Sequence, residues 1–246
     1  MGDGRTAFRA GVVGVAALAA VFGRSRYASA HPDDYIDETF VYQTVERHEA
    51  EVEAWVEARE ARDDSVAGWY TAALEYGLTE RWMADVAFQA VNDPALHFGR
   101  LRVETRYRFA EEGTWPVDLA TSLEYEAEHD ATTGELEQSV TPRLVISKDI
   151  ISSVNTTLNL DLPVRIDQGG TVSFAYALGV RYPARGRFRI GAEVRHDVRA
   201  RIATVFPQLW LLPSHRVGLV VKVGLGVGLT QAADPWVARL SFELEL

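Results

Sequence analysis

The chain has 246 residues, 47% of them hydrophobic and 24% charged, which is ordinary for a folded protein and excludes disordered and collagen-like chains. The formal net charge of −10 argues against a general nucleic-acid binder, because such a protein carries a basic stripe. Cysteine is absent, so disulfides, zinc–thiolate sites and cysteine nucleophiles are excluded together.

The first 30 residues have the three parts of a secretory signal peptide. Arg5 and Arg9 form a basic start, residues 10–23 form an apolar run, and residues 28–30 supply small side chains for cleavage. We expect cleavage before His31. The alternative is an N-terminal membrane anchor, although the run is short for a span. No later stretch holds 18 consecutive apolar residues, which excludes a mature protein built from transmembrane helices.

Residues 31–48 are expected to form a periplasmic leader or a short extra strand. Three arrangements stay open for residues 36–45: a strand of their own, a lead-in from the periplasm, or a segment that enters the mouth of the following domain. Cleavage would place a free amine beside the imidazole of His31, a pair that can chelate copper, although a solvated leader is the alternative. We expect no other metal ligand and no cofactor.

Residues 49–62 are ambiguous in secondary structure. They are rich in Glu and Ala, which are helix formers, and Val45, Val52 and Val56 would form a helical stripe. A period of two fits as well, because Val and Ala alternate with Glu and Trp through residues 51–58. We favour a strand here.

From residue 66 to the end, hydrophobic and polar residues alternate with a period of two. The clearest case is residues 100–109, in which one face is largely apolar and the other carries four arginines and a glutamate. With residues 49–59 included, the pattern predicts twelve strands, at residues 49–59, 66–78, 80–92, 98–110, 115–128, 135–147, 150–162, 171–183, 186–198, 202–212, 217–229 and 235–246.

Two architectures produce this alternation. A soluble β-sandwich buries the apolar face in a core, whereas an outer-membrane barrel turns it to lipid. The predicted strands are eleven residues or longer, which suits tilted membrane strands of about 9–11 residues better than globular strands of about 5–6. We therefore predict an all-β fold, a transmembrane antiparallel β-barrel over residues 49–246. It would lie in the bacterial outer membrane with both chain ends in the periplasm.

Aromatic residues of outward phase gather beside the predicted periplasmic turns, where a membrane–water interface would lie. Aromatics of a soluble core would scatter along the strands instead. We predict a girdle of membrane-interface aromatics made of Tyr76, Trp82, Tyr107, Phe109, Trp115, Tyr182 and Phe188.

Residues 74–82 read LEYGLTERW, which resembles a hairpin common in a loose family of Gram-negative outer-membrane β-barrels. These barrels are often grouped with outer-membrane proteins of phenol meta-cleavage pathways. The resemblance implies the lipid bilayer, the barrel-assembly machinery and a small solute as partners. Such barrels typically end in an aromatic residue, and this chain ends in Leu246 instead.

Charged residues gather on the inward phase of the predicted strands. Opposite charges on adjacent strands stabilise by a few tenths to about 1 kcal/mol a pair. They form either a charged eyelet that selects solutes or an ion-pair network that fills the lumen. The first strand contributes Glu51, Glu53 and Glu57. The other predicted lumen-lining residues are Arg100, Arg102, Glu104, Arg106, Arg108, Asp118, Glu124, Glu126, Arg143, Arg189, Glu193, Arg195, Arg239 and Glu243.

The predicted function is a passive channel or binding site for a small solute. One alternative is a structural envelope barrel whose lumen is filled with ion pairs. The other is a lipid-modifying enzyme, because His196 has outward phase near the predicted outer rim. A base there needs a hydroxyl nucleophile within reach, and no serine of matching phase and height accompanies it. We therefore assign no catalytic residue.

Overall fold

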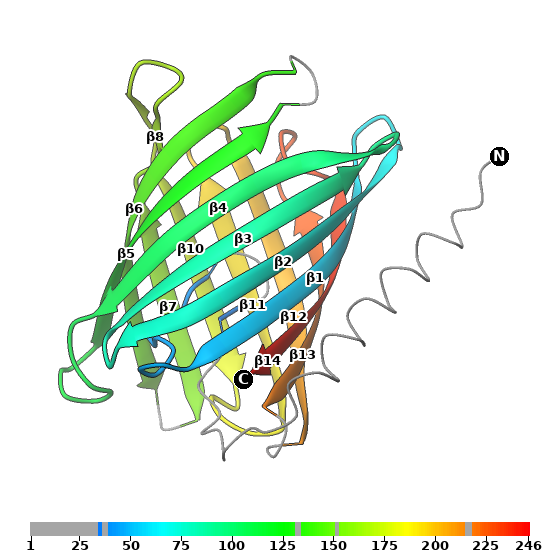
Figure 1. Cartoon of the computed structure of the whole chain (residues 1–246). Helices are drawn as coiled ribbons and strands as arrows, with labels where there is room; N and C mark the ends of the chain where they lie inside the picture. Colours follow the sequence, from blue (N-terminus) through cyan, green and yellow to red (C-terminus); the bar gives the residue numbers. More distant parts are fainter. Residues whose placement is uncertain (1–33, 36–38, 131–133, 151–152, 215–217) are drawn as a thin grey trace.

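The computed structural model describes residues 34–35, 39–130, 134–150, 153–214 and 218–246. In these ranges the chain forms one antiparallel β-sheet that closes on itself as a barrel (Figure 1). No helix in the same ranges is both long and apolar enough to cross a membrane. The predicted signal peptide at residues 1–30 and the copper ligand His31 lie outside the described residues.

Twelve long strands form the barrel wall in the described part of the chain. Two short strands, β8 (Val164–Arg165) and β9 (Thr171–Val172), form a small hairpin that pairs with one end of β6. The wall strands are β1 (Ala50–Glu60), β2 (Val66–Thr79), β3 (Trp82–Asn92), β4 (Leu96–Arg108), β5 (Asp118–His129), β6 (Leu136–Ile150), β7 (Val154–Asp161), β10 (Ala175–Tyr182), β11 (Phe188–Asp197), β12 (Ile202–Ser214), β13 (Leu219–Gly228) and β14 (Trp236–Glu245).

The barrel closes where β1 pairs with β14, from Glu51 opposite Glu245 to Glu60 opposite Trp236. The predicted transmembrane barrel of twelve strands is therefore confirmed. The ambiguous segment at residues 49–62 forms a strand, because its backbone has partners on both sides, in β2 and in β14. We call the rim where β1 begins and β14 ends the termini end, and the opposite rim the loop end. In bacterial barrels the termini end faces the periplasm.

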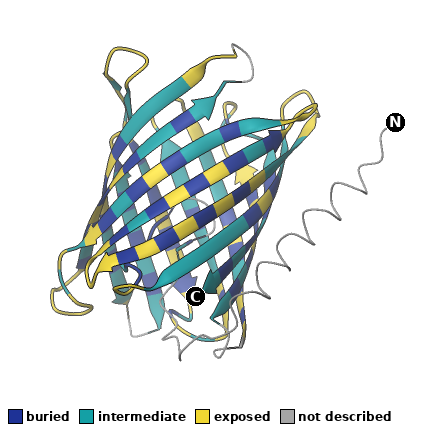
Figure 2. Ribbon diagram, viewed as in Figure 1, coloured by how far each residue is buried: buried dark blue, intermediate teal, exposed yellow. Residues whose placement is uncertain are grey.

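The two faces of the wall differ in exposure, and buried and exposed residues alternate along the strands (Figure 2). On β5, Leu123 is 50% exposed, whereas the neighbouring Ser122 and Glu124 are buried. The exposed outer face is mainly Leu, Val, Ile and aromatic residues, and the buried inner face carries charged and amide side chains. An apolar belt around a polar interior is the arrangement of a barrel surrounded by lipid.

All seven predicted interface aromatics lie on the outer face near the termini end, with exposed fractions of 39–56%. Around one turn the ring centroids of Tyr107 and Phe109 lie 5.7 Å apart, and those of Phe109 and Trp115 lie 6.5 Å apart. A position at the membrane interface stays a prediction for these residues. Their gathering at one end of the barrel supports it.

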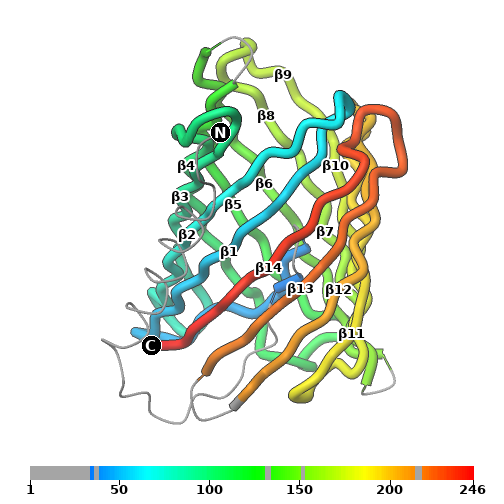
Figure 3. Tube along the Cα trace, turned by 90° about the vertical axis from the view of Figure 1, so that its right-hand side faces the viewer, coloured from blue at the N-terminus to red at the C-terminus, as the bar shows by residue number. Residues whose placement is uncertain are grey.

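The described residues ahead of β1 form no strand. Those up to Val45 lie inside the barrel, and Glu46, Arg47 and His48 are exposed at its rim (Figures 1 and 3). We call residues 34, 35 and 39–48 the inner segment. The expectation of a periplasmic leader or extra strand at residues 31–48 is thereby corrected for the described part. Of the three arrangements left open for residues 36–45, entry into the barrel is the one that the described residues adopt.

The inner segment lies inside the barrel because the wall offers apolar surfaces that match its side chains. Tyr35 and Val41 share a buried cluster with Trp210 of β12. Phe40 and Tyr42 share a second cluster with inward-facing residues of β5 and β6. Removing such side chains from water stabilises by about 1.5–3 kcal/mol for each large one. A free leader in the periplasm would leave them exposed.

Gly77 lets the inner segment pass over the rim and enter β1. A Cβ atom at this position would lie 1.8 Å from the carbonyl oxygen of Glu46. The Gly77 amide donates to the carbonyl of Glu49 (3.0 Å), and the amide of His48 donates to the carbonyl of Gly77 (2.9 Å). The glycine of the LEYGLTERW hairpin therefore serves a close backbone approach.

The assignment of outer and inner faces can be tested by placing a charge on each. Leu123→Arg should lower the free energy of unfolding by about 2–4 kcal/mol, because it moves a guanidinium into lipid near mid-strand. Urea titration of the folded barrel in lipid vesicles measures this. The control is Ser139→Arg, which faces the polar interior at the loop end and should cost much less. Equal costs would mean that the strand phase is displaced by one residue.

Candidate functional site

Three arginine side chains surround Phe40 in the barrel interior, and we call them the arginine cage. The guanidinium carbons of Arg143, Arg106 and Arg102 lie 4.2, 4.5 and 5.7 Å from the centroid of the Phe40 ring. Each cation over an aromatic face is attracted by about 0.5–2 kcal/mol. Phe40 therefore connects the inner segment to β4 and β6.

Buried carboxylates of the wall neutralise the arginine cage. Arg102 pairs with Asp85 of β3 at 2.9 Å. Arg143 pairs with Asp161 of β7 at 2.7 Å and lies 3.8 Å from Glu124 of β5. These groups are almost fully removed from water, and charges in such surroundings persist only when they are paired.

Arg106 is the member of the cage that binds the inner segment most directly. Its guanidinium pairs with Asp34 at 2.9 Å and with Glu104 of its own strand at 3.3 Å. It also donates to the backbone carbonyls of Val41 (3.2 Å) and Gln43 (3.3 Å). One buried wall residue thus binds the inner segment at Asp34, at Val41 and at Gln43.

Tyr35 is held by side chains of β7, β10 and β12. Its hydroxyl donates to Oδ1 of Asn155 (3.0 Å), and its ring meets Trp210 edge-to-face with 5.6 Å between centroids. The guanidinium of Arg181 lies 5.3 Å from the Tyr35 ring. A Cβ atom at Gly179 would come within 2.6 Å of that ring, so the glycine on β10 leaves the room it occupies.

Wall side chains also bind the backbone of the inner segment. The amide of Thr39 donates to Oε2 of Glu193 (3.0 Å), whose Oε1 accepts from Gln208 (2.9 Å). The Lys222 ammonium donates to the carbonyl of Asp34 (2.9 Å). The inner segment therefore occupies the termini half of the lumen with its backbone bound by β4, β11 and β13. The hydroxyls of Thr39, Tyr42 and Thr44 are buried without a hydrogen-bond partner in the described ranges.

A cavity of about 640 Å³ occupies the loop half of the barrel, and we call it the vestibule. Its wall carries charges of both signs, among them Arg100, Glu126 and Arg195. Arg143 and Asp161 also line it. Arg143 also contacts Phe40, so this side chain lies between the vestibule and the inner segment.

The rim of the vestibule is charged as well. Arg165 on β8 pairs with Glu137 at 2.7 Å and with Asp167 at 3.0 Å. The hydrogen bond from Arg165 lowers the pKa of Asp167 to about 2. Asp167 is therefore ionised at neutral pH.

The predicted lumen-lining residues differ in how deeply the structure buries them. Arg100, Arg108, Glu126 and Arg195 are half-buried. The other ten are buried: Arg102, Glu104, Arg106, Asp118, Glu124, Arg143, Arg189, Glu193, Arg239 and Glu243. Whether any of them lines a conducting path stays a prediction.

Sequence reasoning missed several buried partners of these residues. Asp34 lies in a segment without strand periodicity. Asp85, Arg181, Lys222 and Gln208 have inward phase, but each is an isolated charge or amide among small or apolar neighbours. The signal that would have found them is the phase itself, because a charge on the inward face of a membrane strand needs a partner.

The candidate for enzymatic chemistry, His196, lies on the outer face of β11. Its ring meets that of Tyr176, the residue opposite it on β10, edge-to-face with 5.5 Å between centroids. Ser173 faces the vestibule instead. In the described part of the chain no serine hydroxyl is hydrogen-bonded to His196, so the geometry assembles no nucleophile and base there.

A closed twelve-stranded wall with an apolar belt and a charged interior defines the class of bacterial outer-membrane β-barrels. Among solved structures the chain is similar to a COG4313 outer membrane channel from Pseudomonas putida F1, with a TM-score of 0.61 and 13% identity over 87% of this chain and 100% of that one. It is also similar to the KdgM porin, with a TM-score of 0.59 and 9% identity over 79% and 98% of the chains. The NanC porin follows, with a TM-score of 0.52 and 10% identity over 80% and 97%.

Comparison of structures finds similar proteins, whereas comparison of sequences finds none. No family model matches the chain. No curated protein matches it either. The likeness to solved channels therefore shows a shared outer-membrane channel fold.

The ion pairs around Arg143 can be tested for their contribution to stability. Arg143→Met should lower the free energy of unfolding by about 3–5 kcal/mol, because it leaves Asp161 and Glu124 buried without their cation and Glu104 with Arg106 alone. The matched control is Arg81→Met, which removes the exposed pair with Glu111 and should cost about 0–1 kcal/mol. Urea titration of both folded variants gives the comparison. A small loss for Arg143→Met would show that water reaches these carboxylates.

Proposed function

We propose that the protein is an outer-membrane channel for a small hydrophilic solute, closed by its own inner segment. The observation that carries the proposal is the position of Arg143, which lines the vestibule on one side and contacts Phe40 on the other. A solute that enters from the loop end would therefore stop at the ion pairs around Arg143, which the inner segment contacts through Phe40.

The inner segment differs from the rest of the interior in how it is attached. Its described residues reach the wall through hydrogen bonds, ion pairs and ring contacts, and covalently only where the chain continues into β1 at Ala50. Non-covalent contacts of this kind exchange on the timescale of loop motions, whereas wall side chains cannot leave the lumen. Displacement of the segment would join the vestibule to the periplasmic side.

The vestibule supports a hydrophilic rather than an apolar solute, because charged side chains line it on several strands. The KdgM porin, which shares the fold, has been solved in complex with disordered oligogalacturonate. A barrel with this fold has therefore been solved together with a hydrophilic solute. The mixed charge of this vestibule favours a solute that both accepts and donates hydrogen bonds.

One observation favours the alternative of a structural envelope barrel. The inner segment and the arginine cage together fill the termini half, as an ion-pair-filled lumen requires. The two functions differ in conductance. A channel opens when the inner segment is loosened, and a structural barrel does not.

Loosening the inner segment should open the channel. The double variant Tyr35→Ala with Phe40→Ala removes the two aromatic anchors, each substitution weakening segment binding by about 3–5 kcal/mol if the segment does not repack. Single-channel recordings in planar bilayers should then show a higher open fraction or a larger conductance than the wild-type barrel.

The control for this experiment is Gln43→Ala, because Arg106 binds the backbone carbonyl of that residue, which the substitution keeps. It should conduct like the wild type. If the double variant folds and stays silent, the structural barrel replaces the channel as the proposed function.

The vestibule charges should set ion selectivity. Arg100 lines the vestibule and pairs with Glu126 at 2.9 Å. Arg100→Ala, made in the double variant of Tyr35 and Phe40, removes a positive charge from the wall, so selectivity should shift toward cations. Reversal potentials under a KCl gradient measure the shift. An unchanged reversal potential would place the conducting path away from Arg100.

A further inference from the structure

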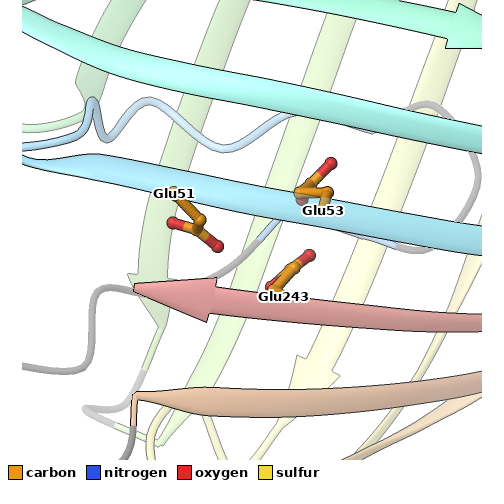
Figure 4. Close-up of side chains that lie close together, drawn as sticks. All are labelled: Glu51, Glu53 and Glu243. Carbon is orange, nitrogen blue, oxygen red and sulfur yellow. The ribbon is translucent and has the colours of Figure 1, made fainter. Parts of the chain in front are cut away.

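Several carboxylates lie close together near the termini end, on the strands that close the barrel. Glu51 and Glu53 of β1 and Glu243 of β14 lie side by side, and their nearest carboxylate oxygens are all within 4.8 Å of one another (Figure 4). The register places Glu53 opposite Glu243 and Glu51 opposite Glu75 of β2. Like charges this close repel one another strongly where water is scarce.

A small cavity of about 40 Å³ adjoins these carboxylates. Glu51, Glu53, Glu75 and Glu243 line it on the side of the wall. Asp34 and four further residues of the inner segment line it on the other side. The cavity is large enough for one ion or one water molecule, and it lies at the contact between wall and inner segment.

Two observations beyond the cluster point to a ligand of positive charge. Glu75 is 9% exposed and lines the cavity, yet in the described ranges its carboxylate forms no hydrogen bond or ion pair. Glu243 is 2% exposed; Lys222 pairs with its Oε1, and its Oε2 accepts no hydrogen bond from the described residues. An ionised carboxylate without a partner is strongly unfavourable in such surroundings.

The neighbouring cations of the protein neutralise only part of this cluster, although Arg106 also lines the cavity. Lys222 pairs with Oε1 of Glu243 and donates to the carbonyl of Asp34. Arg106 pairs with Asp34 and Glu104. Among the described residues neither cation forms an ion pair with the carboxylates at positions 53 and 75.

We propose that this cavity binds one divalent cation, Ca²⁺, through the carboxylates of Glu51, Glu53, Glu75 and Glu243. Ca²⁺ takes carboxylate oxygens in irregular geometry, whereas Mg²⁺ demands an octahedral arrangement and retains several waters, for which the cavity has no room. Because the inner segment forms the other side of the cavity, bound Ca²⁺ ties that segment to β1, β2 and β14. Ca²⁺ binding at this site does not depend on the proposed channel function. Only the closing effect of Ca²⁺ rests on that proposed function.

Calorimetric titration of the full mature chain with CaCl₂ tests the site. The barrel is refolded in detergent without lipopolysaccharide, which itself binds Ca²⁺, and is depleted with EDTA. We expect one Ca²⁺ per chain, with Mg²⁺ binding at least tenfold more weakly. Glu75→Gln and Glu53→Gln should each weaken Ca²⁺ binding at least tenfold. Glu111→Gln, an exposed carboxylate at the same end of the barrel, should leave it unchanged.

Thermal unfolding supplies a second readout, which is measured first on the wild-type barrel. Ca²⁺ should raise the unfolding midpoint of the wild-type barrel, because a ligand that binds only the folded state stabilises it, and should have no such effect on Glu75→Gln. A wild-type barrel that binds no Ca²⁺, or wild-type affinity in both Gln variants, would overturn the site.

Bilayer recordings separate the site from its effect on the channel. Ca²⁺ should lower the open fraction of the wild-type barrel severalfold and leave that of Glu75→Gln unchanged. Ca²⁺ binding without any change in the open fraction would overturn the closing effect and retain the site.

Discussion

In a bilayer every backbone N–H and C=O group must find its partner within the protein, so a sheet can leave no edge open. The pairing of β1 with β14 meets this constraint, and by closing the sheet it gives each strand an inside and an outside. The side chains then sort by phase. Apolar residues such as Leu123 meet lipid, and charged residues such as Arg143 enter a confined interior where each needs a counter-charge.

The interior meets that requirement in two different ways. Between β3 and β7 charges of opposite sign are interleaved, so that the arginine cage and its carboxylates neutralise one another within the wall. At the termini end of β14, β1 and β2 the inward charges include four glutamates close together, and the same fold assembles there a cluster of negative charge. A bound cation would solve there the problem that arginine solves on the opposite side.

The inner segment belongs to both solutions. Phe40 fills the arginine cage, and Asp34 reaches Arg106 and Lys222 from within the lumen. The segment therefore completes the interior without being part of the wall. In the proposed channel, a segment held in this way would link stability and conductance, because each contact that neutralises a wall charge would also keep the path from the vestibule closed.

The sequence by itself determined the class of fold, the number of wall strands and the phase of each. A period of two is a local property, and lipid on one side and water or charge on the other make it visible in any stretch of ten residues. For that reason β1 could be recognised as a strand in spite of its helix-forming composition, and Arg102 or Glu104 could be assigned to the inward face. Hairpin connections then implied which strands are neighbours in the barrel wall.

Only the tertiary structure decided what the inward residues contact. Tyr35 meets Asn155 across 120 positions of sequence, and Arg106 meets Asp34 across 72. Such contacts depend on the diameter and tilt of the closed barrel, which set the side chains that face one another across the lumen. The inner segment has no period at all, so its course through the barrel followed from the shape and charge of the space around it, which exists only once the sheet has closed.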